Sequence, residues 1–237
     1  MGEDIRLKSA AGEIGAYLAS PNGTPKGGIV VIQEIFGVNQ HIRKVTDFFA
    51  GQGYLALAPR FFDHVKPGIE LGYTPDTMAE GRKIVGQLGL DKPVQDVQAA
   101  IEELQKRGAK KVAVSGFCWG GTITWLSSTR LKPDAAIAYY GGGIHGTKSE
   151  KPNAPTMMHF GDKDMHIPME HERDPEAPSR GAGVRLSSRS RLPLRRARLL
   201  RCAGLQEGDG AHAGVFEEAR WLGSLQRKPL RRRRAAP

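Results

Sequence analysis

The stretch "VSGFCWGG" (residues 114–121) places a cysteine, Cys118, with a glycine two residues before it and another two residues after it. It overlaps a run of small and β-branched residues that predicts a buried strand over 110–117, and it leads into a predicted short helix over 120–129. A nucleophile between such glycines, after a strand and before a helix, is typical of a nucleophile elbow. The glycines let neighbouring backbone pass without a clash against a Cβ atom. The pattern therefore predicts that Cys118 lies in a strained turn at the end of a strand.

A cysteine in this position has the surroundings that a thiolate nucleophile needs. The N-terminus of the following helix lowers the pKa of a thiol, and its backbone N–H groups can hold an oxyanion. The alternative is a buried structural residue, because cysteine is among the most buried residue types. The context of strand, turn and helix favours catalysis by Cys118 over that alternative.

The rest of the first 172 residues shows alternating strand and helix patterns. Strands are predicted over 5–9, 13–20, 27–34, 54–59, 110–117, 134–141 and 154–161, and helices over 41–53, 76–88, 94–107 and 120–129. Strands that alternate with helices indicate a parallel sheet covered on both faces. The predicted fold class is therefore α/β, with a mostly parallel central sheet and helices on both sides.

Length and composition fit one domain in a reducing compartment. A chain of 237 residues is long enough to bury the core of a single α/β domain. Its two cysteines, Cys118 and Cys202, have neither the spacing of a zinc site nor that of a disulfide framework, so we expect a cytoplasmic setting. The first ten residues lack the pattern of a secretory signal, and the apolar runs are too short for a membrane span.

The charge of the chain is unevenly distributed. Residues 1–172 carry 19 basic and 19 acidic side chains, whereas residues 173–237 carry 16 basic and 6 acidic ones, so the whole net charge of +10 lies after Glu172. We therefore predict a domain over 1–172 and an Arg-rich, irregular or disordered tail over 173–237. A basic tail can bind nucleic acid or acidic lipid. This tail lacks the interleaved aromatic residues of a single-strand binding surface, so nucleic acid is not the expected partner.

Several separate motifs resemble the dienelactone hydrolase family. They are "VVIQEIFGVNQHIRKVTDFFAGQGYLALAPRFF" (30–62), "GFCWGG" (116–121), "AAIAYYGGGI" (135–144) and "MHFGDKDMHIP" (158–168), and the resemblance runs in order over about residues 5–171. It implies an α/β-hydrolase fold and hydrolysis of a small lactone or ester, typically a carboxymethylene-butenolide. It also implies a Cys-His-Asp triad and no metal or organic cofactor.

The resemblance assigns most of the site. Cys118 matches the nucleophile, and Asp164 matches the acid that orients the histidine, with Asp162 as a rival. Glu34 matches a glutamate that the family holds beside its cysteine, where a carboxylate can accept the thiol proton.

Three further residues take roles around the substrate. The backbone N–H groups of Ile35 and Trp119 match the donors of the oxyanion hole. Arg82 can hold a substrate carboxylate through a bidentate fork, with a solvated helix residue as the alternative.

The histidine is where the sequence departs from the family. Family members carry it in a His-Gly-Phe-like motif before the final helix, and no such motif exists here. The only histidine after His171 is His212, which we take as a candidate base. Codons permitted for residues 196–202, shifted by one base, encode Gly-His-Gly-Phe-Tyr-Asp, which suggests that the tail after about Glu172 is translated out of frame.

The functional expectation is a cysteine-dependent lactone or ester hydrolase that is impaired by loss of the family histidine. Two alternatives stay open at this point. One is a hydrolase of other small esters or thioesters that uses the same elbow. The other is a non-catalytic protein that binds partners through its basic tail, which predicts salt-sensitive binding that depends on residues 173–237.

Overall fold

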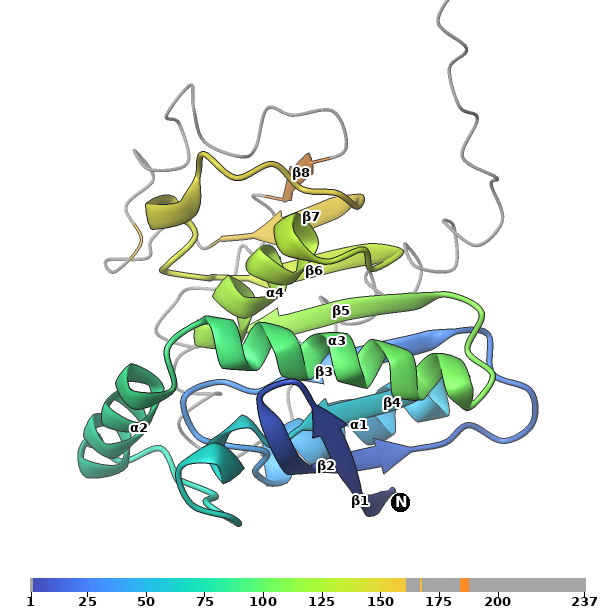
Figure 1. Cartoon of the computed structure of the whole chain (residues 1–237), viewed down its shortest axis with the longest axis horizontal. Coiled ribbons are helices and arrows are strands. Elements are labelled where there is room, and N and C mark those ends of the chain that lie inside the picture. The colour runs from blue at the N-terminus through green and yellow to red at the C-terminus, as the bar shows by residue number, and fades with distance from the viewer. Residues whose placement is uncertain (1, 161–166, 168–183, 188–237) are drawn as a thin grey trace, which may run out of the picture.

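A mixed β-sheet runs through the part of the chain that the computed structural model describes, which is residues 2–160, 167 and 184–187. Within these residues the sheet has eight strands in the spatial order β1-β2-β4-β3-β5-β6-β7-β8 (Figure 1). The strands are β1 (Glu3–Ser9), β2 (Gly12–Ala19), β3 (Gly28–Ile32), β4 (Leu55–Pro59), β5 (Val112–Phe117), β6 (Ala135–Tyr139), β7 (Thr156–His159) and β8 (Val184–Ser187). The helices are α1 (Gln40–Gly51), α2 (Pro75–Leu88), α3 (Asp91–Lys106) and α4 (Trp119–Arg130), with 3-10 turns η1 (Phe61–His64) and η2 (His145–Thr147).

The register of the sheet brings the ends of its central strands together. Every neighbouring pair from β4 through β3 and β5 to β8 is parallel, whereas β2 pairs antiparallel with both β1 and β4. Ile32 of β3 lies opposite Gly116 of β5, and Phe117 lies opposite Tyr139 of β6. The predicted mostly parallel sheet is confirmed, and the loops after β3, β5 and β6 leave from the same edge.

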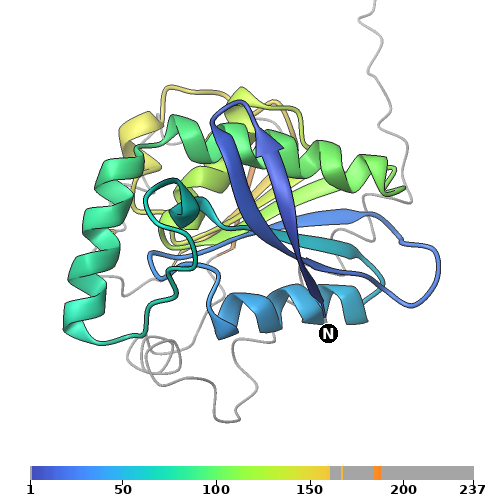
Figure 2. The same cartoon turned by 60° about the horizontal axis from the view of Figure 1, so that its bottom comes forward.

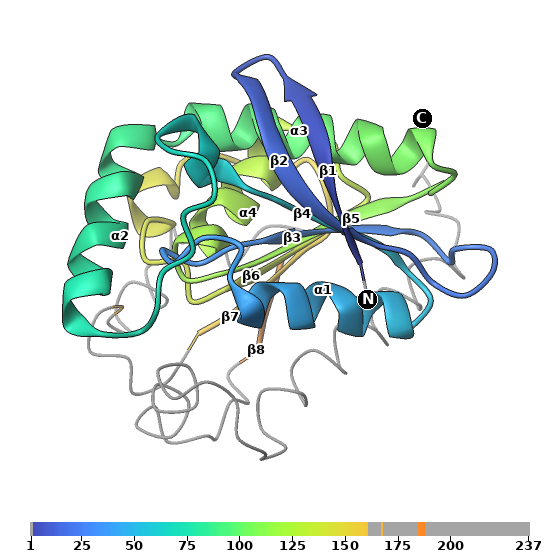
Figure 3. The ribbon, with the colours of Figure 1, turned by 90° about the horizontal axis from the view of Figure 1, so that it is seen from below.

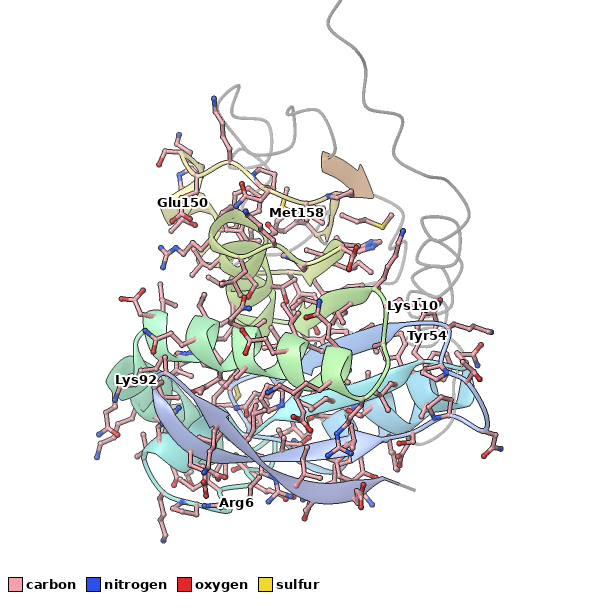
Figure 4. All side chains as sticks on the ribbon, turned by 45° about the vertical axis from the view of Figure 1, so that its right-hand side comes forward. Arg6, Tyr54, Lys92, Lys110, Glu150 and Met158 are labelled. Carbon is pink, nitrogen blue, oxygen red and sulfur yellow. The ribbon has the colours of Figure 1, made fainter. Side chains whose placement is uncertain are left out.

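Helices cover the two faces of the sheet in separate layers. Figure 3 shows α1 on one face, with α3 and α4 on the other. Alternate residues of β3 follow this division: Ile29 and Val31 pack in the cluster that includes α1, and Val30 and Ile32 pack in the cluster that includes α3 and α4. Figure 4 shows side chains filling the space between these layers, with Met158 of β7 far from Arg6 of β1. The apolar residues of β3 do not alternate with polar ones because both faces of this strand are buried.

The β1–β2 hairpin twists away from the sheet, and β1 packs against α3 (Figure 2). A buried polar cluster joins these elements to η1. Ser9 of β1 donates its hydroxyl to Asp96 of α3 at 2.5 Å, and the Nε2 atom of His64 lies 2.8 Å from the other carboxylate oxygen of Asp96. Asp96 is fully buried, and this burial raises the pKa of its carboxyl group, although the hydrogen bonds from Ser9 and His64 act in the opposite direction.

The starts of two helices are set by side-chain caps beside the strand ends. Asn39 caps α1, because its Oδ1 atom accepts hydrogen bonds from the backbone N–H groups of His41 and Ile42. Thr74 caps α2 in a capping box with Thr77. The two caps lie close together, because the Nδ2 atom of Asn39, which follows β3, lies 3.3 Å from the hydroxyl of Tyr73, the residue before Thr74.

Two expectations about the elements need correction. The third helix begins at Asp91 rather than at residue 94, because Pro93 is tolerated in a first helical turn. The predicted boundary after Glu172 is not the edge of the sheet, since β8 pairs in parallel with β7. Val184 and Leu186 alternate with polar residues over only four positions, which is too short a run to stand out in an Arg-rich sequence.

The rest of the predicted tail, residues 173–183 and 188–237, lies outside the described residues. The proposed shift of reading frame and the alternative of a basic binding tail therefore stay predictions. Among the described residues, no helix combines the length and the apolar character that a membrane crossing requires.

Candidate active site

Cys118 occupies a strained turn between β5 and α4. Its backbone dihedrals are φ 57° and ψ −121°, which is a region that residues with a Cβ atom rarely adopt. The turn is anchored on both sides: the N–H of Cys118 donates to the carbonyl oxygen of Tyr139 at 3.0 Å, and its carbonyl oxygen accepts from Gly121 N–H at 2.9 Å. The structure therefore has the predicted order of strand, elbow and helix, with the side chain of Cys118 half-buried.

The glycines around Cys118 are required by the close approach of three backbone segments. A Cβ atom on Gly116 would clash with the carbonyl oxygen of Gly120, and one on Gly120 would clash with that of Gln33 at the end of β3. A Cβ atom on Gly121 would clash with the carbonyl oxygen of Tyr139. The steric reason for the sequence pattern is thus present at each glycine, and it packs the first turn of α4 directly onto the ends of β3 and β6.

Glu34 lies beside the elbow and is almost fully buried. It stands two residues beyond Ile32, as Cys118 stands two residues beyond Gly116, and Ile32 and Gly116 are paired neighbours. Only 4% of Glu34 is exposed. The hydroxyl of Tyr73 donates to its Oε2 atom and the hydroxyl of Tyr140 to its Oε1 atom, each at 3.5 Å. A buried carboxylate therefore lies at the same edge of the sheet as the proposed nucleophile.

The two residues predicted to form the oxyanion hole, Ile35 and Trp119, directly follow Glu34 and Cys118 in the sequence. Ile35 and Trp119 are both 9% exposed and belong to the same apolar cluster. Trp119 is the first residue of α4, so its backbone N–H has no acceptor within the helix. Its indole ring meets the ring of Phe61 edge-on, with centroids 5.9 Å apart. The geometry provides a helix N-terminus that can receive negative charge next to Cys118.

The remaining predicted residues are not brought to this point by the described structure. Arg82 is exposed on α2, although its neighbour Gly81 packs against the carbonyl oxygen of Ile35. Asp164 and its rival Asp162 lie outside the described residues, as does His212. The structure therefore places Glu34, Ile35, Cys118 and Trp119 together at the ends of β3 and β5. It places Arg82 on the exposed surface of α2.

Sequence reasoning missed the two tyrosines that contact Glu34. Tyr140 directly follows β6, and Tyr73 directly precedes the cap of α2, so neither belongs to a regular pattern. One sequence signal could have identified Tyr140: it lies between a predicted strand and three glycines, where a sharp backbone turn is expected. Tyr140 has φ 40°, and Cys118 and Tyr140 are the only two non-glycine residues with positive φ in the described part of the chain.

A row of three rings continues from the elbow across the sheet. Phe117 stacks on Tyr139 with centroids 4.9 Å apart, and Tyr139 stacks on His159 at 4.6 Å. Their strands β5, β6 and β7 are consecutive and the three residues are in register. These rings lie on the face of the sheet that α1 covers, because Phe117 and Tyr139 belong to the same apolar cluster as residues of α1. Their stacking connects the ends of the three strands.

Comparison with known proteins gives the site its context. The family model for the "Dienelactone hydrolase family" matches residues 14–187. A Synechocystis protein with the provisional name carboxymethylenebutenolidase is 36% identical over 66% of this chain and 70% of its own length. The carboxymethylenebutenolidase of Pseudomonas putida is 32% identical over 70% of this chain and 73% of its own.

A solved structure agrees with the fold. The crystal structure of a provisionally named dienelactone hydrolase from Klebsiella pneumoniae superposes with a TM-score of 0.78 at 24% identity, and covers 94% of this chain and 98% of that one. The predicted α/β-hydrolase fold is confirmed by this likeness together with the strand order and the elbow. The chain belongs to the dienelactone hydrolase family of carboxylic ester hydrolases.

Proposed function

We propose that this chain attacks small lactones and esters with the thiolate of Cys118, and that its substrates belong to the carboxymethylene-butenolide class named for its relatives. The observation that carries the proposal is the strained elbow, in which a half-buried cysteine stands at the start of α4 beside the buried carboxylate of Glu34. A strained conformation persists only where the surrounding structure enforces it, and such positions concentrate at functional sites.

Acylation follows from the groups at this edge of the sheet. The Sγ proton of Cys118 passes to a carboxylate oxygen of Glu34, and the thiolate attacks the carbonyl carbon of the lactone. The displaced electron pair rests on the carbonyl oxygen, which the backbone N–H groups of Ile35 and Trp119 stabilise. Collapse of this intermediate re-forms the carbonyl and breaks the ring C–O bond. The released oxygen takes the proton back from Glu34, and the acyl group remains on Cys118 as a thioester.

Hydrolysis of the thioester needs a base that activates water. In the family this base is a histidine oriented by an acid, and Asp164 is the residue that matches this acid. His212 is the one histidine after His171, and it stands outside any His-Gly-Phe-like motif. We therefore propose that acylation proceeds while thioester hydrolysis is slow. No metal or organic cofactor enters either step.

Substrate recognition is proposed to involve Arg82. Its guanidinium is exposed on α2, next to the glycine that packs against Ile35. A guanidinium at this position can bind the carboxylate of a substrate through two parallel hydrogen bonds. A hydrolase that uses the same elbow for other small esters or thioesters would not depend on Arg82.

A pre-steady-state assay tests the proposal. The full chain, mixed with an excess of p-nitrophenyl ester, should release about one equivalent of p-nitrophenol in a burst, followed by a slow steady rate. With a carboxymethylene-butenolide it should instead consume about one equivalent of lactone in the burst, because ring opening leaves the whole molecule attached to Cys118. Mass spectrometry should locate the acyl group on Cys118, and Cys118→Ala should abolish both burst and adduct. Full turnover by Cys118→Ala would overturn the nucleophile. Rapid turnover by the unaltered chain, abolished by His212→Ala, would instead assign the base to His212.

A further inference from the structure

The carboxylate of Glu34 is contacted by two tyrosine hydroxyls from distant parts of the chain. Tyr140, which follows β6, reaches Oε1, and Tyr73, which precedes α2, reaches Oε2, both at 3.5 Å. Each hydroxyl therefore contacts a different carboxylate oxygen. We call Tyr73 and Tyr140 together the tyrosine bracket.

Both members of the tyrosine bracket are held in place by other contacts. The Nδ2 atom of Asn39 lies 3.3 Å from the hydroxyl of Tyr73, whose ring packs on Phe36 with centroids 4.5 Å apart. The backbone N–H of Tyr140 donates to the carbonyl oxygen of His159 at 2.7 Å. Tyr140 also has positive φ, a strain that it shares only with Cys118 among non-glycine residues of the described ranges. A strained, anchored position beside the elbow is typical of a functional residue.

The bracket affects the two protonation states of Glu34 unequally. A hydroxyl that donates a hydrogen bond to a carboxylate stabilises the ionised form over the protonated one. The stabilisation matters here because Glu34 is almost fully buried, and burial favours the protonated form. Both contacts are longer than the range of about 2.5–3.0 Å that is usual for hydroxyl donors, so each hydroxyl stabilises the ionised carboxylate only modestly.

We infer that Tyr73 and Tyr140 are positioning residues that stabilise the ionised form of Glu34 and thereby lower the thiolate fraction of Cys118 in the free enzyme. The inference rests on the proposed function, in which the proton of Cys118 passes to Glu34. In the resting pair the negative charge resides on the carboxylate. When the proton moves to Glu34, the negative charge resides on Sγ, and the hydrogen bonds from the two hydroxyls to the now neutral carboxyl group become weaker. The tyrosine bracket thus limits the fraction of thiolate, and the reactivity of Cys118, in the free enzyme.

Alkylation of the full chain by iodoacetamide at neutral pH tests this inference. The rate constant for labelling of Cys118 is proportional to the thiolate fraction. Tyr73→Phe and Tyr140→Phe each destabilise only the form with ionised Glu34, so each should label faster, by about two- to tenfold, and the double variant faster still. Tyr17→Phe is the matched control: it removes a tyrosine–carboxylate hydrogen bond, to Asp47 at 2.9 Å, that involves no site residue.

The same tyrosine substitutions in a Glu34→Gln variant distinguish an effect that acts through Glu34 from a general loosening of the packing. In the Glu34→Gln variant no carboxylate accepts the proton, so adding either tyrosine substitution should leave the labelling rate unchanged. An equal acceleration in that background would overturn the inference, as would bracket variants that label no faster than Tyr17→Phe. Both results would leave the proposed nucleophile intact. The proposed function fails by a different result, namely no label and no acyl adduct on Cys118 in the unaltered chain.

Discussion

The backbone N–H of Cys118 donates to the carbonyl oxygen of Tyr139 at 3.0 Å, so the proposed nucleophile is fixed to the end of β6 as well as to β5. The same carbonyl oxygen faces the position that a Cβ atom on Gly121 would occupy. The elbow therefore depends on a backbone approach that leaves no room for a side chain, and a single added methyl group can test it.

Gly121→Ala should disrupt the elbow. The new methyl group must push α4 away from β6, and we expect the free energy of unfolding to fall by about 1–3 kcal/mol, as for other overpacked sites, with loss of acylation of Cys118 by p-nitrophenyl ester. Gly86→Ala in α2 is the control, because no atom lies near its added Cβ and alanine favours helix by up to about 1 kcal/mol. Urea denaturation of both variants measures the difference. Equal stability of the two variants would show that the approach at Gly121 can relax.

Two substitutions of Asn39 should separate its two roles. Asn39→Ala removes the cap of α1 and should lower the free energy of unfolding by about 1 kcal/mol. Asn39→Asp keeps a capping oxygen but loses the Nδ2 atom that contacts Tyr73. The same Nδ2 atom also donates to the carbonyl oxygen of Leu71 at 3.3 Å, so the variant should keep the cap but lose part of the stability. Its carboxylate should accept the hydroxyl proton of Tyr73 in place of Glu34, and so raise the iodoacetamide labelling rate of Cys118. A stable Asn39→Asp variant with an unchanged rate would show that Tyr73 does not need Asn39.

Asp96 should make stability depend on pH in the acidic range. Burial raises the pKa of this carboxyl group in the folded protein, so the folded state binds the proton at a higher pH than the unfolded chain does. Its contribution to stability is therefore complete below the ordinary value of about 3.9, and it is lost as the pH rises through the raised pKa. Asp96→Asn, which cannot titrate, should remove this slope.

The measurement compares urea denaturation of the wild-type chain and Asp96→Asn between about pH 4 and pH 5.5, below the usual titration of histidine. The difference in unfolding free energy, wild type minus variant, should fall as pH rises. A constant difference over this range would mean that the pKa of Asp96 is not raised.

Arg82→Ala should affect only substrates that carry a carboxylate. Loss of a charge-assisted pair should slow acylation by a carboxymethylene-butenolide by about ten- to a hundredfold. Acylation by p-nitrophenyl acetate, which has no carboxylate, should be unchanged. Lys83→Ala, at the adjacent exposed position of α2, is the control. Equal losses on both substrates would assign Arg82 to the fold rather than to substrate binding.

The elbow and the sheet could be predicted because they rest on short-range sterics and periodicity. The glycines around Cys118 are needed because neighbouring backbone segments approach closely. At each of these glycines an added Cβ atom would clash with a backbone carbonyl oxygen. The tyrosine bracket could not be predicted in this way, because Tyr140 and Glu34 are 106 residues apart and meet only through the strand order. The strand β8 was missed because four residues carry too little alternation to outweigh an Arg-rich composition.

The groups assigned to acylation all come from one continuous part of the sequence, since Glu34, Cys118 and Tyr140 lie within the first 140 residues. Asp164, the proposed acid, and His212, the candidate base of the second half-reaction, come later. If the proposed roles hold, the gene encodes the groups for the two half-reactions in succession. On the proposed chemistry, a lesion confined to its 3′ part converts a recycling catalyst into a single-use acceptor. Such a chain would bind one lactone per molecule covalently, as a thioester that is hydrolysed only slowly.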